Sequence, residues 1–193
     1  MRRIRRFSAT PGLGTSYLNG GAWVGMGTVY FPNNLFLSET LTNQAFVNVR
    51  YFSPGFTSWA PNSLTLNNCS LAFGADGFQL AATNNVVVDA GSALSILGGQ
   101  TLACRDLVLT NGGCLYATAA ATNCWGTNYS VTVTATGTMS VGDSSWVYPY
   151  SDLTNGGGVL FQVGNLNVAG PGGGFNADGK GFRGGGVIGP NWS

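Results

Sequence analysis

Hydrophobic and polar positions between Ser63 and Val141 follow one short pattern that occurs four times. Each copy has an alternating apolar run, a small polar turn and a second apolar run. The first runs end 22, 21 and 24 residues apart, at Leu66, Val88, Leu109 and Val133. A pattern that recurs at this period predicts a solenoid, in which short coils stack because none can bury its apolar face alone.

We expect the apolar runs to be strands whose alternate side chains point into the coil. Strands of successive coils then lie parallel, about 4.8 Å apart, with equivalent residues above one another. Two interior columns are predicted, Leu66, Val88, Leu109 and Val133 in the first, and Leu71, Leu94, Leu115 and Met139 in the second. The turns contain Asn and Gly, which tolerate left-handed backbone, and we expect asparagine side chains to form a ladder along this corner.

The repeat divides the chain into four parts. Residues 1–21 are a basic and Gly/Ser-rich lead-in, and residues 22–62 predict irregular N-terminal strands with a capping coil. Regular coils are expected over 63–168, with an insertion at 144–158 that interrupts the rhythm, and 169–193 is a Gly-rich segment. Because this last segment contains no capping sequence, we expect a fragment of a longer solenoid.

The composition supports an all-β protein and argues against a nucleic-acid partner. Only 8% of the residues are charged and 44% are hydrophobic, which argues against both a helical bundle and a disordered chain. The net charge of +1 gives no strong field, so no nucleic-acid partner is expected. No apolar run reaches the length of a transmembrane helix, and the arginines before Phe7 lack the apolar region of a signal peptide.

The sequence offers little catalytic chemistry. It contains no histidine, which excludes Ser-His-Asp catalysis and histidine-ligated zinc. The carboxylates are scattered, and Asp89 and Asp106, 17 residues apart, should not stack. Arg105 and Asp106 are expected to form an exposed ion pair. We assign no catalytic residue, and the sequence favours a non-catalytic protein over an enzyme.

The cysteines leave two interpretations open. Cys69, Cys104, Cys114 and Cys124 form no Cys-x-x-Cys pair, which argues against a zinc or thioredoxin-like site. We favour free buried thiols, because Cys69 and Cys114 stand beside the second apolar run of their repeats. A Cys114–Cys124 disulfide is the leading alternative.

Two segments are candidates for binding. The insertion contains Trp146, Tyr148 and Tyr150, which we assign as ligand-binding residues, since insertions on solenoids commonly bind partners. The alternative is that these rings pack on their own coil. Asn176 and Asp178 faintly resemble a calcium loop. Because this loop has one carboxylate and lies near the cations Lys180 and Arg183, we expect no metal and no cofactor.

Coils of the form Val-x-Val-x-x-x-Gly-x-Leu-x-Val, followed by Gly-Gly-Phe-Asn-Ala-Asp-Gly-Lys-Gly-Phe-Arg-Gly-Gly, resemble a known family over roughly residues 63–186. These are large secreted bacterial β-solenoid proteins, autotransporter-passenger-like and adhesin-like. The resemblance implies a right-handed, single-stranded parallel β-helix, similar to the pectate-lyase fold. It also implies an extracellular or cell-surface location and adhesion to glycans or surface proteins. A polysaccharide lyase or glycoside hydrolase, and a trimeric phage tailspike-like fibre, are the alternatives.

Overall fold

The computed structural model describes residues 6–9, 26–120, 129–152 and 157–181. Within these ranges the regular secondary structure consists of β-strands, without an α-helix. The N-terminal strands are β1 (Phe7–Ser8), β2 (Gly27–Tyr30), β3 (Thr40–Leu41), β4 (Phe46–Val47), β5 (Val49–Phe52) and β6 (Ser58–Trp59). The body consists of β7 (Leu64–Asn67), β8 (Ser70–Phe73), β9 (Gln79–Ala81), β10 (Asn85–Asp89), β11 (Ala93–Leu97), β12 (Thr101–Cys104), β13 (Asp106–Leu109), β14 (Cys114–Thr118), β15 (Val131–Val141), β16 (Trp146–Tyr150), β17 (Val159–Val168) and β18 (Gly174–Phe175).

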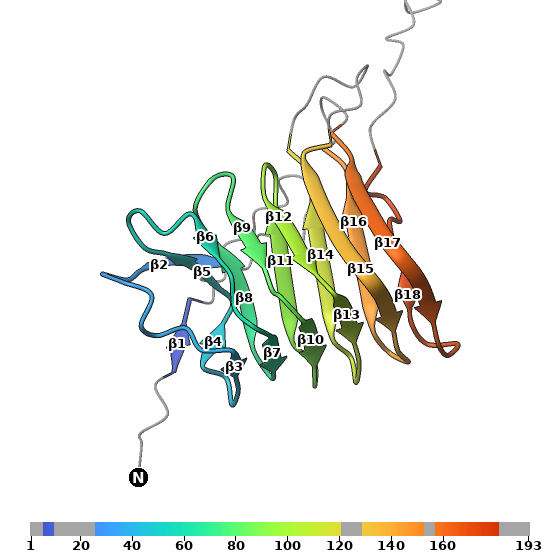
Figure 1. The fold of residues 1–193 in the computed structure, drawn as a ribbon, viewed down its shortest axis with the longest axis horizontal. Helices are drawn as coiled ribbons and strands as arrows, with labels where there is room; N and C mark the ends of the chain where they lie inside the picture. The colour runs from blue at the N-terminus through green and yellow to red at the C-terminus, as the bar shows by residue number, and fades with distance from the viewer. Residues whose placement is uncertain (1–5, 10–25, 121–128, 153–156, 182–193) are drawn as a thin grey trace, which may run out of the picture.

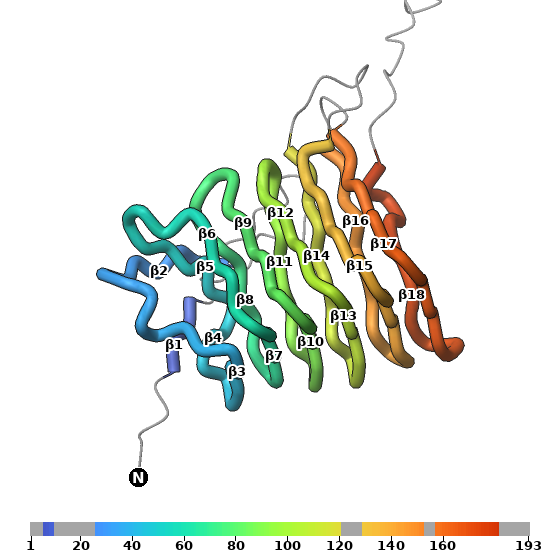
Figure 2. The backbone as a smooth tube through the Cα atoms, viewed as in Figure 1, coloured from blue at the N-terminus to red at the C-terminus, as the bar shows by residue number. Residues whose placement is uncertain are grey.

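These strands form a parallel β-solenoid, as the repeat predicts. Successive coils line up from the N-terminal to the C-terminal end, and their strands pair in parallel with the coils on either side (Figures 1 and 2). The small sheet has the order β18-β16-β14-β11-β8-β5-β2. The large sheet runs β3-β7-β10-β13-β15-β12-β9-β6, with β17 added beside β15. A repeat that is too short to fold alone thus obtains its backbone partners from its neighbours.

The long strand β15 joins two rows of the large sheet. Its first half pairs with β12, and its second half pairs with β13. In earlier coils the same path is divided between two strands, so that each coil contributes one strand to the small sheet and two to the large one. The two rows meet at a corner beside Arg105, whose carbonyl accepts the amide of Gly137.

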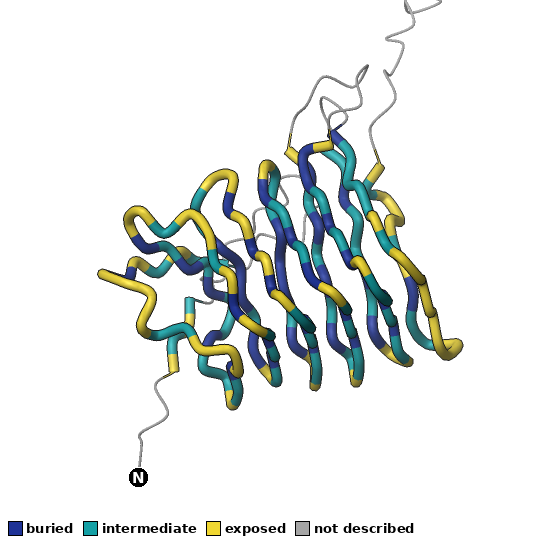
Figure 3. The backbone as a smooth tube through the Cα atoms, in the orientation of Figure 1, coloured by how far each residue is buried: buried dark blue, intermediate teal, exposed yellow. Residues whose placement is uncertain are grey.

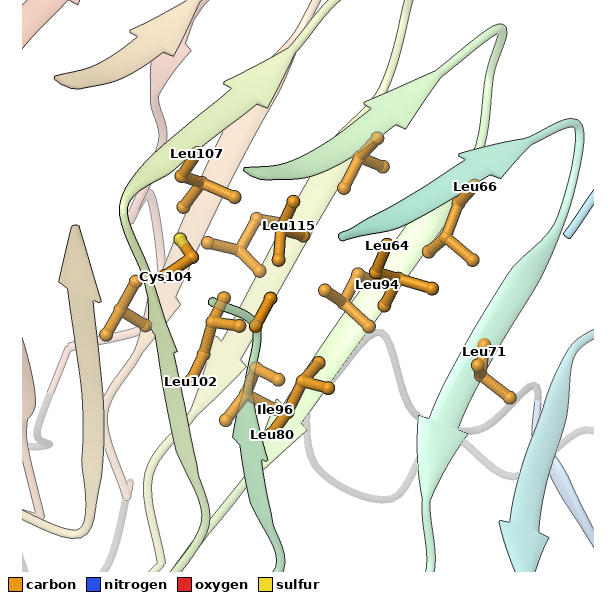
Figure 4. Close-up of a cluster of buried hydrophobic side chains, with 14 of the residues drawn as sticks. Leu64, Leu66, Leu71, Leu80, Leu94, Ile96, Leu102, Cys104, Leu107 and Leu115 are labelled. Atoms are coloured by element: carbon orange, nitrogen blue, oxygen red, sulfur yellow. The ribbon is translucent and has the colours of Figure 1, made fainter. Parts of the chain in front are cut away.

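The predicted interior columns are confirmed for their first three members. Val88 lies opposite Leu66 and Leu109, and Leu94 lies opposite Leu71 and Leu115. Figure 4 shows Leu66, Leu71, Leu94 and Leu115 pointing into the coil, together with Leu80 and Leu102 from the second row of the large sheet. Each predicted column residue in these three coils is fully buried.

The prediction was wrong for the fourth member of each column. Val133 lies opposite Leu102 and Met139 lies opposite Leu107, whereas the true partners of Leu109 and Leu115 are Val141 and Val147. The coil has lengthened: residues 119–130 connect β14 to β15, where residues 98–100 connect β11 to β12. The alternation around Val133 is that of a strand, but it occupies the other row of the large sheet.

The segment 144–158 is not simply an insertion. Trp146–Tyr150 forms β16, which pairs in register with β14 over its whole length. The extra residues of this coil precede β15 instead. The segment interrupts the rhythm of the repeat, but the alternation of half-buried Trp146, buried Val147 and half-buried Tyr148 is that of a strand with one buried face.

Polar side chains stabilise the corner after β7, β10 and β13. The amides of Asn67 and Asn111 donate to the two carboxylate oxygens of Asp89, over 3.0 and 2.7 Å. The expected ladder is therefore present, with an aspartate as its middle member. Left-handed backbone follows at Asn68, Ala90 and Asn111. At Asn68 and Asn111 this is the conformation that the Asn-rich turns predict.

The N-terminal end is closed by aromatic side chains. Phe7 of β1 packs against Phe31, Phe36 and Phe46, with ring centroids 4.9 to 5.5 Å away. Phe46 is fully buried and Phe31 is nearly so. Strand β1 pairs with β4, so Phe7 and Ser8 of the predicted lead-in belong to the folded end of the solenoid. The basic residues before Arg6 lie outside the described residues.

Three cysteines, Cys69, Cys104 and Cys114, are free thiols, as the first interpretation predicts, and the first two are buried. Cys124, the partner in the alternative disulfide, lies outside the described residues. Burial raises the pKa of the Cys104 thiol to about 11, because the interior disfavours the thiolate.

We therefore expect Cys104 to resist alkylation in the folded protein. At pH 8 its thiolate fraction should be about a hundredfold below that of an ordinary cysteine, so iodoacetamide should modify it correspondingly slowly. Mass spectrometry of the peptide that contains Cys104 measures this rate, and the same reaction in urea is the control. Equal rates with and without urea would contradict the buried position.

Among the residues that the structure describes, no helix is long and apolar enough to cross a membrane.

Candidate functional site

Four aromatic residues gather on the outer side of the small sheet, near its C-terminal end. We call them the aromatic face; they are Tyr116 of β14 and Trp146, Tyr148 and Tyr150 of β16. Their neighbours Leu115 and Val147 are fully buried in the interior. Because side chains alternate across a strand, the aromatic residues point away from that interior.

The rings form a stack that follows the register of the strands. Tyr116 lies opposite Tyr148, and their ring centroids are 4.7 Å apart with planes only 9° from parallel. Along β16, Tyr148 is 6.5 Å from Trp146 and 5.8 Å from Tyr150. The separation of the stacked pair is close to the distance between neighbouring strands, so the sheet itself holds these rings in contact.

The next coil leaves part of this face uncovered. Trp146 lies opposite Gly174 of β18, which has no side chain to place over the indole. Trp146 and Tyr148 are half-buried, whereas Tyr150 is only 8% exposed. The ammonium group of Lys180 lies 5.3 Å from the centre of the Tyr150 ring. A ligand would therefore meet Trp146 and Tyr148 first, with the Lys180 ammonium group at the Tyr150 end of the face.

The tyrosines are neutral at physiological pH. Burial raises the pKa of Tyr116 to about 12, with smaller contributions from the neighbouring Cys114, Tyr148 and Tyr150. Burial also raises the pKa of Tyr148 and of Tyr150. The aromatic face therefore carries no negative charge, and its phenol groups are hydrogen-bond donors and acceptors. Such a surface suits ligands that are apolar on one side and rich in hydroxyl groups on the other.

Of the sequence-predicted binding residues, the structure brings Trp146, Tyr148 and Tyr150 together with Tyr116, which the sequence analysis missed. The missing signal was the length of the coil. Tyr116 precedes Tyr148 by 32 residues, and a period of 21 to 24 does not align them. The prediction that these rings lie on an insertion was wrong, since they lie on strand β16, which pairs in register with β14.

Several carboxylates connect neighbouring coils. Glu39 accepts the backbone amide of Asn62 over 2.6 Å, and Asp143 accepts that of Gly172 over 3.0 Å. Asp89 accepts the two asparagine amides of the corner ladder. These carboxylates accept hydrogen bonds from residues of neighbouring coils, so they stabilise the stacking of the coils.

Asp106 also connects neighbouring coils through a hydrogen bond. One of its oxygens accepts the amide of Thr138 and the other accepts Arg105 Nε, both over 2.8 Å. The predicted Arg105–Asp106 ion pair is therefore confirmed, with both side chains partly exposed. The Thr138 amide and, after it, the Arg105 side chain hold the pKa of Asp106 below its usual value. Asp106 lies opposite Asn85, so it does not stack on Asp89, as expected.

The weak calcium candidate forms a local turn. Asn176 Oδ1 accepts the amide of Asp178 over 2.9 Å, and the Lys180 amide donates to the carbonyl of Ala177. The side-chain oxygen of Asn176 thus has a structural role. Within the described ranges, no group of three or more Cys, Asp or Glu side chains is placed to hold a metal ion. Arg183 lies outside these ranges.

Comparison with known proteins identifies no relative of this chain, so its assignment is based on the fold. No protein-family model matches the chain, and neither the curated proteins nor the solved structures contain a match to it. The chain is an all-β parallel β-solenoid with an aromatic face on its small sheet.

Proposed function

We propose that this protein is a non-catalytic solenoid of the cell surface or extracellular space that binds glycans through its aromatic face. The observation that carries the proposal is the row of aromatic rings on paired strands of the small sheet, with Tyr148 stacked on Tyr116 and Trp146 beside it. The location rests on the low charge of the chain and on its resemblance to secreted β-solenoid proteins.

A sugar ring matches the chemistry of this surface. One side of a pyranose is lined by C–H groups, which pack well on aromatic faces, whereas its rim carries hydroxyl groups that bond to phenols. Trp146 supplies the largest partly exposed ring, and Gly174 beside it leaves room for a ligand. Lys180 adds a donor that suits a hydroxyl or a uronic carboxylate.

The roles of the carboxylates support the non-catalytic part of the proposal. Glycoside hydrolysis requires two carboxyl groups that face one another across the scissile bond. Glu39, Asp89, Asp106 and Asp143 instead accept hydrogen bonds from neighbouring coils. The aromatic face has a cation beside it, Lys180, but the rings themselves offer no acid–base pair.

We expect Trp146→Ala to weaken glycan binding about tenfold or more, because it removes the largest accessible ring. Affinity electrophoresis through gels that contain pectin, alginate or a neutral glycan measures the dissociation constant for each. Tyr30→Ala is the matched control, because it removes an exposed aromatic residue (72% exposed) from the small sheet at the other end of the solenoid.

Equal losses in the two variants, or no retention of wild-type protein by any glycan, would overturn the binding site. The same glycans, assayed for new reducing or unsaturated ends, test the enzymatic alternative. Turnover that Asp106→Ala abolishes would overturn the non-catalytic assignment.

A further inference from the structure

Lys180 is held at one end of the aromatic face by its own backbone. Its amide donates to the carbonyl of Ala177, and its carbonyl accepts the amide of Ser151, both over 3.0 Å. The second of these bonds joins the turn after β18 to the residue that follows Tyr150. The Lys180 ammonium group lies 5.3 Å from the centre of the Tyr150 ring. The backbone thus places one cation at the Tyr150 end of the row of rings.

No Asp or Glu side chain pairs with this cation. All seven Asp and Glu residues of the chain lie within the described ranges, where the one ion pair is that of Arg105 with Asp106. Lys180 is nevertheless partly buried. Water and salt screen a partly buried pair of charges less than a fully exposed one. An anionic group of a ligand would therefore gain from contact with this ammonium group.

The accessible rings lie close enough to the cation for one ligand to contact both. Trp146 and Tyr148 occupy partly exposed positions of β16, in a body whose strands alternate between buried and partly exposed positions (Figure 3). The Tyr148 ring is 6.5 Å from that of Trp146 and 5.8 Å from that of Tyr150, beside which the ammonium group lies. These separations lie within the length of a short oligosaccharide.

We propose that the aromatic face selects oligosaccharides that carry a single carboxylate. The carboxylate pairs with the Lys180 ammonium group, while a neutral sugar unit packs on Trp146 and Tyr148. This inference rests on the proposed glycan binding and adds the chemical class of the ligand. It requires the cation and the rings to act on the same molecule, which their arrangement on neighbouring coils allows.

Two carboxylates near the cation limit the charge of the ligand. Asp178 lies two residues before Lys180, and Asp152 directly follows Ser151, whose amide is bonded to the Lys180 carbonyl. Charges this near to one another interact at ordinary ionic strength, where the Debye length is about 10 Å. Asp152 and Asp178 therefore repel further carboxylates of a ligand, so a polyanionic chain gains nothing over a chain with one carboxylate.

Calorimetric titration of the full chain with matched oligosaccharides tests this selectivity. The probes are short oligomers of galacturonic, glucuronic or mannuronic acid in three forms: fully methyl-esterified, with one free carboxylate, and with all carboxylates free. For an oligomer that binds, one free carboxylate should lower the dissociation constant about fivefold relative to the full ester at low salt, as expected for one partly exposed ion pair. This preference should shrink in about 1 M NaCl, where the Debye length is about 3 Å.

Lys180→Met removes the ammonium group and keeps an apolar side chain, so it should bind the full ester and the single-carboxylate form equally. Lys180→Arg should retain the preference. Arg105→Gln is the matched control, because it also removes one positive charge, but from the corner of the large sheet, and should leave the preference intact.

Three outcomes would overturn this inference alone: equal affinities of the wild type for the ester and the single-carboxylate form, a preference that Lys180→Met retains, or tightest binding of the fully free form. Each of them leaves glycan binding by the rings in place. Absence of binding to every form, or ester binding that Trp146→Ala does not weaken, would overturn the glycan site itself and this inference with it.

Discussion

Replacing Leu94 by alanine is expected to lower the free energy of unfolding by about 2–5 kcal/mol. Leu94 is fully buried, and it lies in the second interior column between Leu71 and Leu115. Removing its side chain leaves a cavity that the coils on both sides line, and these coils cannot collapse into it without breaking their own register. Urea unfolding followed by circular dichroism measures the change.

Leu35→Ala is the matched control for this loss, because Leu35 is 83% exposed and its truncation should change stability by less than about 0.5 kcal/mol. Similar changes for the two variants would show that Leu94 does not occupy the interior. A loss confined to Leu94→Ala would support the column, which is the central structural feature of the solenoid.

Gly113→Ala is expected to destabilise the protein by more than about 3 kcal/mol, or to prevent folding. A β-carbon at Gly113 would collide with the backbone carbonyl of Val88 in the preceding coil. That carbonyl accepts the amide of Thr110, so it cannot move without loss of an inter-coil hydrogen bond. Soluble yield and urea unfolding measure the effect.

Gly181→Ala provides the control for Gly113→Ala, since a β-carbon there meets no other atom within 4 Å. We expect its stability to stay within about 0.5 kcal/mol of the wild type. If Gly113→Ala unfolds at the same urea concentration as the wild type, the coils do not approach one another as closely as the structure shows.

Part of this architecture is readable from the chain because each local signal agrees with the others. The apolar alternation around Leu66, Val88 and Leu109 recurs at almost constant spacing, and Asn or Gly follows each run. While the length of the coil stays nearly constant, each column residue lies about one period from the residue of the coil before it. Regular spacing therefore determines the register of the first three coils.

The same rule explains why the fourth coil was misplaced. The longer connection 119–130 carries no signal of its own, and Val133 has the same local pattern as a first-row strand. Only pairing distinguishes the two rows of the large sheet, and pairing is long-range. The partnership of Tyr116 with Tyr148 depends on that register, so the stacked part of the candidate site was equally hidden.

The sequence by itself determined that this protein is an all-β parallel solenoid with apolar columns and a polar corner ladder. Those features depend on period, alternation and residue type, which are local properties. Tertiary structure alone decided that Trp146–Tyr150 is a strand and that its rings stack on the preceding coil. Each of these depends on which coil lies beside which, and the contacts that select the neighbour join residues far apart in the chain.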